Sequence, residues 1–272
     1  MKVLLTNDDG IGATGLHVLR RRLLEVPGIE LAVIAPNTNR SASARSITTR
    51  RPLWVEEVEF GDGTIGYATD GTPVDCVRFA ALGLVEFRPE LIVSGINHGA
   101  NLGDDITYSG TVAAALEGIV LGIPAIAVSQ QSARGEMDFR LGEEFDFEEV
   151  AIFVARLVEE LEEVPIPEGT LLNINAPACD AKGARVCRLG KRIYRDRLQL
   201  EEEEENGRRR RYRLYGADPS YEPEPGTDFA AIADGYVAVT PLHFDLTDQA
   251  GIAALKDFDL DRLIQPASRE IE

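Results

Sequence analysis

Residues 1–10 of the chain read Met-Lys-Val-Leu-Leu-Thr-Asn-Asp-Asp-Gly, and the fold is decided by this stretch. The apolar run 3–6 is short and continuous, which is typical of a strand buried on both faces of a parallel sheet. The polar residues 7–10 follow it without a break. Further apolar runs of the same kind predict the remaining central strands, at residues 31–35, 91–94, 125–129 and 171–175.

Helical segments alternate with these strands. Leucine spacing predicts a helix after Gly12, and residues 71–75 (Gly-Thr-Pro-Val-Asp) carry the Thr cap and third-position Asp of a helix start. Residues 112–121 are rich in alanine, and residues 147–161 place apolar side chains on one helix face and acidic ones opposite. The alternation predicts an α/β fold with a doubly wound, mostly parallel sheet.

The overall charge excludes several classes of partner. The chain has 272 residues, of which 46 are Asp or Glu and 28 are Lys or Arg, and its formal net charge is −18. Such a polyanion is repelled by phosphate backbones and by anionic lipid, so we expect no binding to long nucleic acid or to a membrane surface. No apolar run approaches the ~18 residues of a membrane span.

The cysteines and the N-terminus indicate the cellular compartment. Cys76, Cys179 and Cys187 are odd in number and contain no CxxC pair, so we expect reduced core residues rather than a zinc site. The first residues lack the basic-then-apolar pattern of a signal peptide. A cytoplasmic protein is therefore expected.

Residues 200–212 read Leu-Glu-Glu-Glu-Glu-Glu-Asn-Gly-Arg-Arg-Arg-Arg-Tyr. If Asn206-Gly207 forms a type I′ turn, four glutamates face four arginines across a β-hairpin. The predicted pairs are Glu205–Arg208, Glu204–Arg209, Glu203–Arg210 and Glu202–Arg211. Neither face of the tip is apolar, so we expect a projecting arm that lies on a partner subunit, because a two-stranded arm is marginal alone. The alternative is a disordered charged loop.

Three polar loops follow predicted strands, and ligands of open parallel sheets bind beyond the carboxyl ends of the strands. The loops are residues 7–10, residues 39–43 and residues 95–105. The adjacent carboxylates of Asp8 and Asp9 repel each other unless a cation neutralises them. The carboxylate, hydroxyl and amide oxygens of the three loops suit a hard divalent cation such as Mg²⁺ or Mn²⁺.

The Ala-rich helix is preceded by Tyr108-Ser109-Gly110-Thr111. A helix start of this kind presents backbone N–H groups and hydroxyls at the positive end of the helix dipole, where a phosphate can bind. Taken singly, the Asp pair is more often a turn or a cap, and Ser109 is more often an ordinary cap. Their joint placement on one rim predicts a metal-assisted phosphate site.

The same residues resemble a known family, the survival protein SurE family. The resemblance runs in order from residue 1 to about residue 248. The motifs that carry it are residues 1–10, Ala35-Pro36 with Asn39-Arg40-Ser41, Gly71-Thr72-Pro73 with Asp75-Cys76-Val77, Ser94-Gly95-Ile96-Asn97, residues 101–105, Tyr108-Ser109-Gly110-Thr111-Val112, residues 226–230 and Thr240-Pro241-Leu242-His243.

This resemblance implies a phosphatase of the 5′-nucleotidase type that depends on one divalent metal ion per subunit. It would act on nucleoside 5′- and 3′-monophosphates, and on short polyphosphate in some relatives. The implied metal ligands are Asp8, Asp9, Ser41 and Asn97. The implied phosphate and substrate contacts are Asn7, Asn101, Ser109, Gly110 and Thr111.

The implied mechanism is attack by a metal-activated water, with Asp8 and Asp9 as the catalytic residues and either of them handling the water's proton. An aspartyl-phosphate on Asp8 is an alternative, although the expected Asp-x-Asp spacing is absent. A non-catalytic regulator that binds nucleotide or metal is another. His98 is a further candidate, for protonation of the leaving group.

The resemblance also implies a Rossmann-like domain over residues 1–180 and a C-terminal extension over residues 181–272. The extension would contain the hairpin, at about residues 193–215, and a tail, exchanged between subunits to give dimers or tetramers. Arg45 departs from the usual Ser-Gly-Ala-Ser-Asn run and lies near the expected pocket. Trp54, between Leu53 and Val55, is expected to be a packing residue, with stacking on a base as the alternative.

Overall fold

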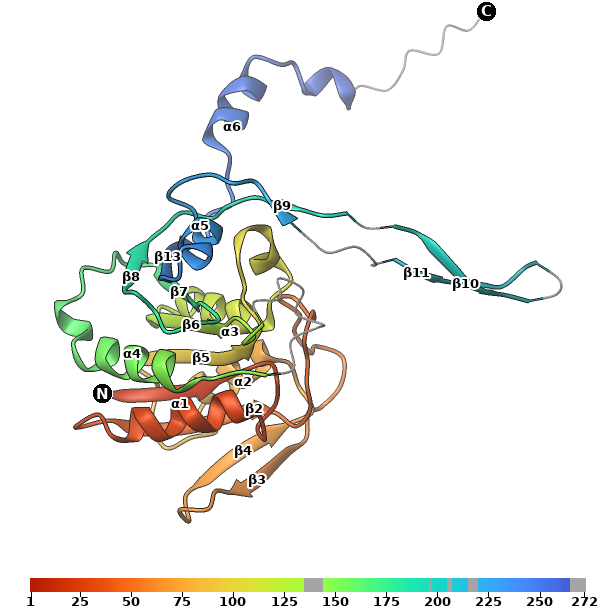
Figure 1. The fold of residues 1–272 in the computed structure, drawn as a ribbon. Helices are drawn as coiled ribbons and strands as arrows, with labels where there is room; N and C mark the ends of the chain where they lie inside the picture. The colour runs from red at the N-terminus through yellow and green to blue at the C-terminus, as the bar shows by residue number, and fades with distance from the viewer. Residues whose placement is uncertain (135–143, 196, 205–206, 215–219, 265–272) are drawn as a thin grey trace, which may run out of the picture.

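A mostly parallel sheet forms the centre of the molecule (Figure 1). The computed structural model describes residues 1–134, 144–195, 197–204, 207–214 and 220–264. Within them, nine strands have the order β3-β4-β2-β1-β5-β6-β7-β13-β8. The central strands are β1 (Lys2–Thr6), β2 (Glu30–Pro36), β5 (Leu91–His98), β6 (Ala125–Gln130) and β7 (Thr170–Ala176), and adjacent ones are parallel. They confirm the strands predicted from the apolar runs.

Helices cover both faces of this sheet. Helices α1 (Thr14–Leu24) and α4 (Glu148–Glu159) pack together on one face, and α2 (Pro73–Ala81) and α3 (Gly110–Val120) pack on the other. Leucines of α1 and valines of α4 share one core, whereas small residues of α2 and α3 share the second. The predicted doubly wound α/β fold is confirmed.

Two local predictions have clear outcomes. The Thr72 hydroxyl accepts from the Asp75 N–H at 3.2 Å, and Asp75 accepts from the Thr72 N–H at 2.9 Å, so α2 begins with the predicted capping box. Strand β5 extends four residues beyond its predicted end, to His98. It passes through Gly95, where a Cβ atom would lie 2.3 Å from the Val128 carbonyl oxygen, and its register with β6 shifts there.

Strands β3 (Val55–Glu59) and β4 (Ile65–Thr69) were not expected from the sequence. They form an antiparallel pair at the edge of the sheet, with β4 parallel to β2. Strand β3 is mostly exposed and has glutamate at three of its five positions, so it lacks the apolar pattern that marks the central strands. Its position as an edge strand explains the polar sequence.

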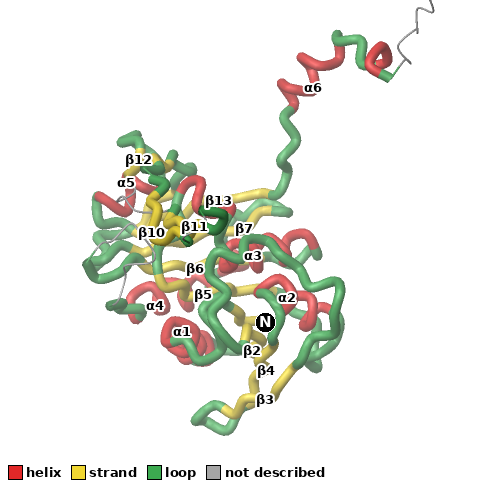
Figure 2. Tube along the Cα trace, turned by 90° about the vertical axis from the view of Figure 1, so that its right-hand side faces the viewer, coloured by secondary structure: helices red, strands yellow, loops and turns green. Residues whose placement is uncertain are grey.

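The chain beyond residue 180 contributes two strands to the same sheet. Strand β13 (Val237–His243) lies between β7 and β8 (Ala184–Val186), antiparallel to β7 and parallel to β8. Other short elements are β9 (Arg192–Ile193), β12 (Ser220–Tyr221), α5 (Asp228–Ala233), α6 (Gln249–Lys256) and the 3₁₀ turn Asp261–Leu263. Helix α6 stands away from the body in both views (Figures 1 and 2).

The hairpin arm consists of β10 (Gln199–Glu203) and β11 (Arg210–Arg213), which project from the body (Figure 1). Glu203 pairs with Arg210 and Glu202 with Arg211, as predicted, and the Glu204 N–H donates to the Arg209 carbonyl at 3.0 Å. Residues 205 and 206 lie outside the described residues, so the Glu205–Arg208 pair and the turn itself stay predictions.

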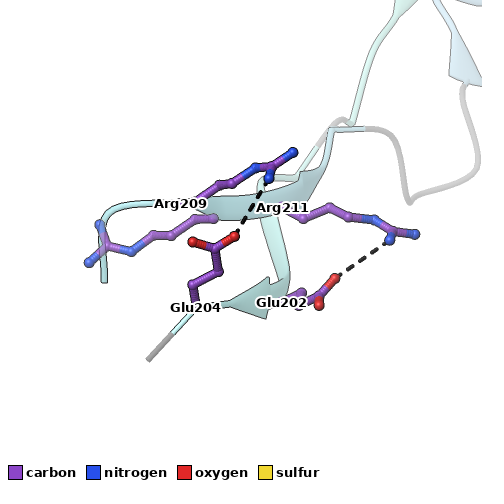
Figure 3. Close-up of a pocket in the computed structure, with 5 residues that line it drawn as sticks. Glu202, Glu204, Arg209 and Arg211 are labelled. Carbon is purple, nitrogen blue, oxygen red and sulfur yellow. Dashed lines mark ion pairs between the residues drawn. The ribbon is translucent and has the colours of Figure 1, made fainter. Parts of the chain in front are cut away.

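Side chains of the arm also form three of the predicted ion pairs, and Figure 3 shows two of them, Arg209–Glu204 and Arg211–Glu202. Their N···O distances are 2.7 Å for Arg210–Glu203 and 3.6 Å for both Arg209–Glu204 and Arg211–Glu202. The charged ends of these side chains face water, where an ion pair contributes between 0 and about 1 kcal/mol. These ion pairs therefore add little to the stability of the arm.

The three cysteines are free. Cys76 and Cys187 are buried as expected, whereas Cys179 is exposed, so its assignment to the core is wrong. Cys179 follows the end of β7, where the chain turns to the surface. Among the helices that the structure describes, none has the length and apolar character needed to span a bilayer.

Candidate active site

The carboxyl ends of β1, β2 and β5 meet the start of α3 at one rim of the sheet. Asp8 and Asp9, directly after β1, are bonded to the neighbouring loops. The Arg40 N–H donates to the Asp8 carbonyl at 2.6 Å, and the His98 N–H donates to Asp9 Oδ2 at 3.0 Å. The three predicted loops therefore converge around the two aspartates.

Asp8 is buried against the first turn of α3. Its Oδ1 accepts from the Thr111 hydroxyl at 2.5 Å. A Cβ atom added to Gly110 would lie 2.7 Å from the Asp8 Cβ and 2.9 Å from its Oδ2, closer than packed atoms approach. Glycine at position 110 thus allows the helix N-terminus to rest directly on the carboxylate.

The two carboxylates are in an environment that disfavours two negative charges. Burial, with a contribution from the charge of Asp9, raises the pKa of Asp8 to about 6. Burial also raises the pKa of Asp9, and this effect is opposed by hydrogen bonds from the His98 N–H and from Asn39. No Lys or Arg among the described residues forms an ion pair with either carboxylate, so the protein itself places no paired positive charge beside them.

Asn97 and Ser41 lie in the two flanking loops. Asn97 donates through Nδ2 to the Gly99 carbonyl at 2.6 Å, which orients the amide and leaves its carbonyl oxygen as an acceptor for a cation or a donor group. The Ser41 N–H donates to Asn39 Oδ1 at 2.7 Å, and Asn39 Nδ2 donates to Asp9 at 3.0 Å. Asn39 therefore connects the Ser41 loop to the Asp pair, although the sequence analysis gave it no role.

Asn7 and Asn101 are held in fixed positions. Asn7 is fully buried, and its amide bonds the Gly10 backbone in both directions, at 2.9 and 3.1 Å, so it closes the loop that carries the Asp pair. Asn101 Nδ2 donates to the Ser129 hydroxyl at 2.9 Å, and the Asn101 backbone carbonyl accepts from Asn173 Nδ2 and Asn175 Nδ2. The two asparagines of β7, both buried, were missed by the sequence analysis, although a polar pair within an apolar strand is a usable signal.

The helix start at residues 109–111 is arranged as predicted, but its hydroxyls are already bonded. Ser109 caps α3 by accepting from the Val112 N–H at 3.1 Å, and Thr111 donates to Asp8. The first N–H groups of a helix lack intrahelical partners, so they are the groups that a phosphate would meet at this position.

Two other residues considered from the sequence, Arg45 and His98, have defined surroundings. Arg45 forms an ion pair with Glu117 of α3 at 2.6 Å. The His98 ring stacks on Phe145 and Phe147, at 5.1 and 5.0 Å between ring centroids, and burial lowers the pKa of this histidine. A neutral imidazole is a weaker proton donor than its cation, which disfavours His98 as the general acid.

Trp54 is 80% exposed, so the expectation that it is a packing residue is wrong. Its backbone N–H donates to Asp70 Oδ1 at 2.9 Å, and the next residue, Val55, pairs with Thr69 at the carboxyl end of β4. The indole therefore stands in solvent at the rim that carries the Asp pair.

Comparisons with known proteins agree with the fold. The family model described as Survival protein SurE matches residues 3–196. Curated relatives named 5′-nucleotidase SurE, from Rubrobacter xylanophilus and Herpetosiphon aurantiacus, are 52% and 45% identical to this chain. The alignments cover 97% and 91% of this chain, and 99% and 94% of the relatives.

A solved structure is also similar over most of its length. The "Crystal Structure of Sure Protein from Aquifex aeolicus" superposes with a TM-score of 0.76 at 37% sequence identity. The match covers 94% of this chain and 100% of that one. With a family model that matches most of the chain and relatives that align almost end to end, the chain belongs to the survival protein SurE family.

Proposed function

We propose that this chain is a divalent-metal-dependent phosphomonoesterase that hydrolyses nucleoside 5′- and 3′-monophosphates to nucleoside and phosphate. The enzyme class, a hydrolase of phosphate monoesters, agrees with the curated relatives, which are named 5′-nucleotidases. The observation that carries the proposal is the adjacent pair of buried Asp8 and half-buried Asp9, with Asp8 packed against the N-terminus of α3. Among the residues that the structure describes, no Lys or Arg forms an ion pair with either carboxylate.

The donor set at the rim fits a hard cation. Asp8, Asp9, Ser41 and Asn97 would hold one Mg²⁺ or Mn²⁺ through oxygen atoms, the ligands that both ions prefer. When bound, the cation would neutralise charge on the phosphoryl group and lower the pKa of a water molecule.

The remaining residues bind the substrate and move the proton. The start of α3, from Ser109 to Thr111, and Asn101 hold the phosphate oxygens. Asp8 or Asp9 accepts the proton of the attacking water, and the contacts favour neither one. Asn7, whose amide is used within its own loop, acts by shaping that loop.

The decisive experiment is a substrate panel. Phosphate release from AMP, GMP and 3′-AMP is measured with Mn²⁺ or Mg²⁺, with and without EDTA. We expect release that requires the metal and is abolished by EDTA. Release that survives chelation would contradict the metal-dependent mechanism, and no release from any substrate would favour the non-catalytic regulator.

The same substrates also separate direct attack by water from attack by Asp8, when the reaction is quenched in acid. Direct attack by water gives no covalent intermediate, whereas nucleophilic attack by Asp8 gives an aspartyl-phosphate that acid quenching can trap. Because Asp8 Oδ1 is bonded to Thr111 and the carboxylate rests on Gly110, direct attack by water is the route that we favour. A burst of product together with trapped phosphoenzyme would contradict it.

The exposed indole of Trp54 provides a test of substrate recognition. Stacking of a base on an aromatic ring contributes ~1–3 kcal/mol. We expect Trp54→Ala to raise KM for AMP about five- to tenfold and to leave KM for ribose 5-phosphate, which has no base, unchanged. Trp54→Phe serves as the control that keeps a ring. An equal effect on both substrates would rule out a base-stacking role.

The proposal also includes assembly into a homo-oligomer. Helix α6 has no buried residue, and large apolar side chains of the tail such as Leu246, Leu255 and Leu263 are exposed, which supports a homo-oligomer formed by exchange of the arm or the tail. Activity on short polyphosphate, a cytoplasmic location and the division at residue 180 stay predictions.

A further inference from the structure

Helix α3 carries a fully buried carboxylate that the proposed reaction does not use. Glu117 is 0% exposed and lies between two arginines. Arg45 contacts its Oε2 at 2.6 Å, and Arg78 contacts its Oε1 at 2.6 Å. Buried acids persist in proteins when they are paired, so this glutamate is present as the partner of both cations.

The two arginines come from different parts of the fold. Arg78 is on α2, which packs against α3. Arg45 belongs to the loop that follows β2 and contains Ser41. Glu117 therefore connects that loop to the helix whose first turn touches Asp8.

The loop needs such an anchor because its backbone is strained. Ala42 and Ala44 have φ angles of 58° and 51°, in the left-handed region that costs a residue with a Cβ atom roughly 1–2 kcal/mol. Backbone bonds fix it at two points, from Arg40 to Asp8 and from the Ala44 N–H to the Tyr108 carbonyl at 3.1 Å. Arg45 supplies its ionic anchor.

A ring covers the other side of the Arg45 guanidinium. The centroid of the Phe244 ring lies 4.5 Å from Arg45 Cζ, a distance at which a cation is attracted to an aromatic face. Phe244 directly follows β13, so it extends from the sheet and is not part of the loop. The guanidinium is thus held by α3 on one side and by the end of β13 on the other.

We propose that Arg45 is a positioning residue for the metal site, which fixes the Ser41 loop beside Asp8 and Asp9 through its ion pair with Glu117. This inference rests on the proposed function, because it assigns Ser41 to the metal. Loss of this ion pair would let the loop leave its strained conformation. Metal affinity would then fall about 10- to 100-fold, as is typical when a residue that supports a metal ligand is removed.

Arg78 offers a matched control. It contacts the same carboxylate at the same distance, so Arg45→Gln and Arg78→Gln each remove one ion pair from Glu117. Only the first releases the loop. Both should lower Tm, whereas only Arg45→Gln should change the metal site.

The test measures three quantities on the full chain. Mn²⁺ binding without substrate is followed by electron paramagnetic resonance of the free ion, hydrogen exchange is followed in residues 40–48, and KM and kcat are measured for AMP. For Arg45→Gln we expect Mn²⁺ affinity at least about tenfold weaker and faster exchange in residues 40–48. For Arg78→Gln we expect Mn²⁺ affinity within about twofold of the parent and unchanged exchange. Arg45→Lys, which keeps the charge, should lie between parent and Arg45→Gln.

A double substitution checks the route of the effect. In a Glu117→Gln background, adding Arg45→Gln should cause little further loss of Mn²⁺ affinity. Equal Mn²⁺ affinities in Arg45→Gln and Arg78→Gln, or a parent-like Arg45→Gln, would overturn the proposal. If the parent chain binds no Mn²⁺, the proposed function fails. Hydrogen exchange in residues 40–48 then tests the anchoring role of Arg45 separately. Faster exchange in Arg45→Gln alone would support this role, and equal exchange in Arg45→Gln and Arg78→Gln would refute it.

Discussion

Asp8→Asn and Asp9→Asn are each expected to lower kcat/KM for AMP by about a thousandfold or more. Asparagine keeps the shape of the side chain but removes one of the two negative charges at the rim. If a bound metal supplies ~4 kcal/mol to the transition state, its loss corresponds to about a thousandfold in rate. Steady-state kinetics at saturating Mn²⁺, with each variant, measures the effect.

Asp8→Asn should not lower the stability of the metal-free protein, although it lowers activity. Folding raises the pKa of Asp8 from its ordinary value of 3.8 to about 6, so without metal the ionised carboxylate destabilises the folded protein at pH 7. This destabilisation is absent below pH 3.8 and grows as the pH rises from 3.8 through 6. Asp8→Asn should therefore have a Tm equal to or above that of the metal-free parent, and should lose the rise in Tm that Mn²⁺ gives the parent.

A control acid distinguishes this result from a general effect of charge. Asp62 pairs with Arg20 near the β3–β4 turn, away from the rim. Asp62→Asn should keep both the kcat/KM of the parent and its Mn²⁺-induced rise in Tm. Parent-like activity in both Asp8→Asn and Asp9→Asn would remove the aspartate pair from the mechanism.

Gly110→Ala is expected to lower kcat/KM about a hundredfold and Tm by several degrees. Alanine is the better helix former, so helix propensity alone predicts a gain in stability. The added Cβ atom would instead lie 2.7 Å from the Asp8 Cβ. Position 110 is in the first turn of α3, and Asp8 is in the loop that Asn7 closes after β1, so neither atom moves freely. Relieving such a contact costs ~1–3 kcal/mol and moves either the carboxylate or the helix start.

Gly12→Ala is the matched control, since nothing lies within 4 Å of the position that its Cβ would take. Kinetics, Mn²⁺ binding and thermal melting are compared between the two variants. If Gly110→Ala keeps parent kinetics, the contact between Asp8 and the start of α3 does not matter for turnover.

Several features could be predicted from the sequence because their causes are local. The run at residues 3–6 is apolar because β1 is buried on both faces, and the Thr72–Asp75 capping box is closed by residues three apart. Convergence of the loops at residues 7–10 and 95–105 follows from one property of parallel sheets, that the carboxyl ends of the strands share an edge.

Other features depend on pairings that no short pattern specifies. The bond from Asn39 to Asp9 joins residues thirty positions apart, and Arg45 reaches Glu117 across seventy-two. An amide or a guanidinium in a loop can bond to many partners, and the fold selects one. The exposure of Trp54 was mispredicted for a related reason, because apolar neighbours in sequence do not fix which side of an edge strand faces water.

The insertion of β13 between β7 and β8 has a consequence for protein synthesis. Chains emerge from the ribosome N-terminus first. Every residue assigned to the rim, up to Thr111, is therefore translated long before residues 237–243 arrive to complete the sheet. Until then β7 presents a row of unpaired N–H and C=O groups, which is the kind of edge that recruits other chains. A chain truncated before residue 237 would therefore contain all the proposed catalytic residues but would expose β7 as an aggregation-prone edge strand.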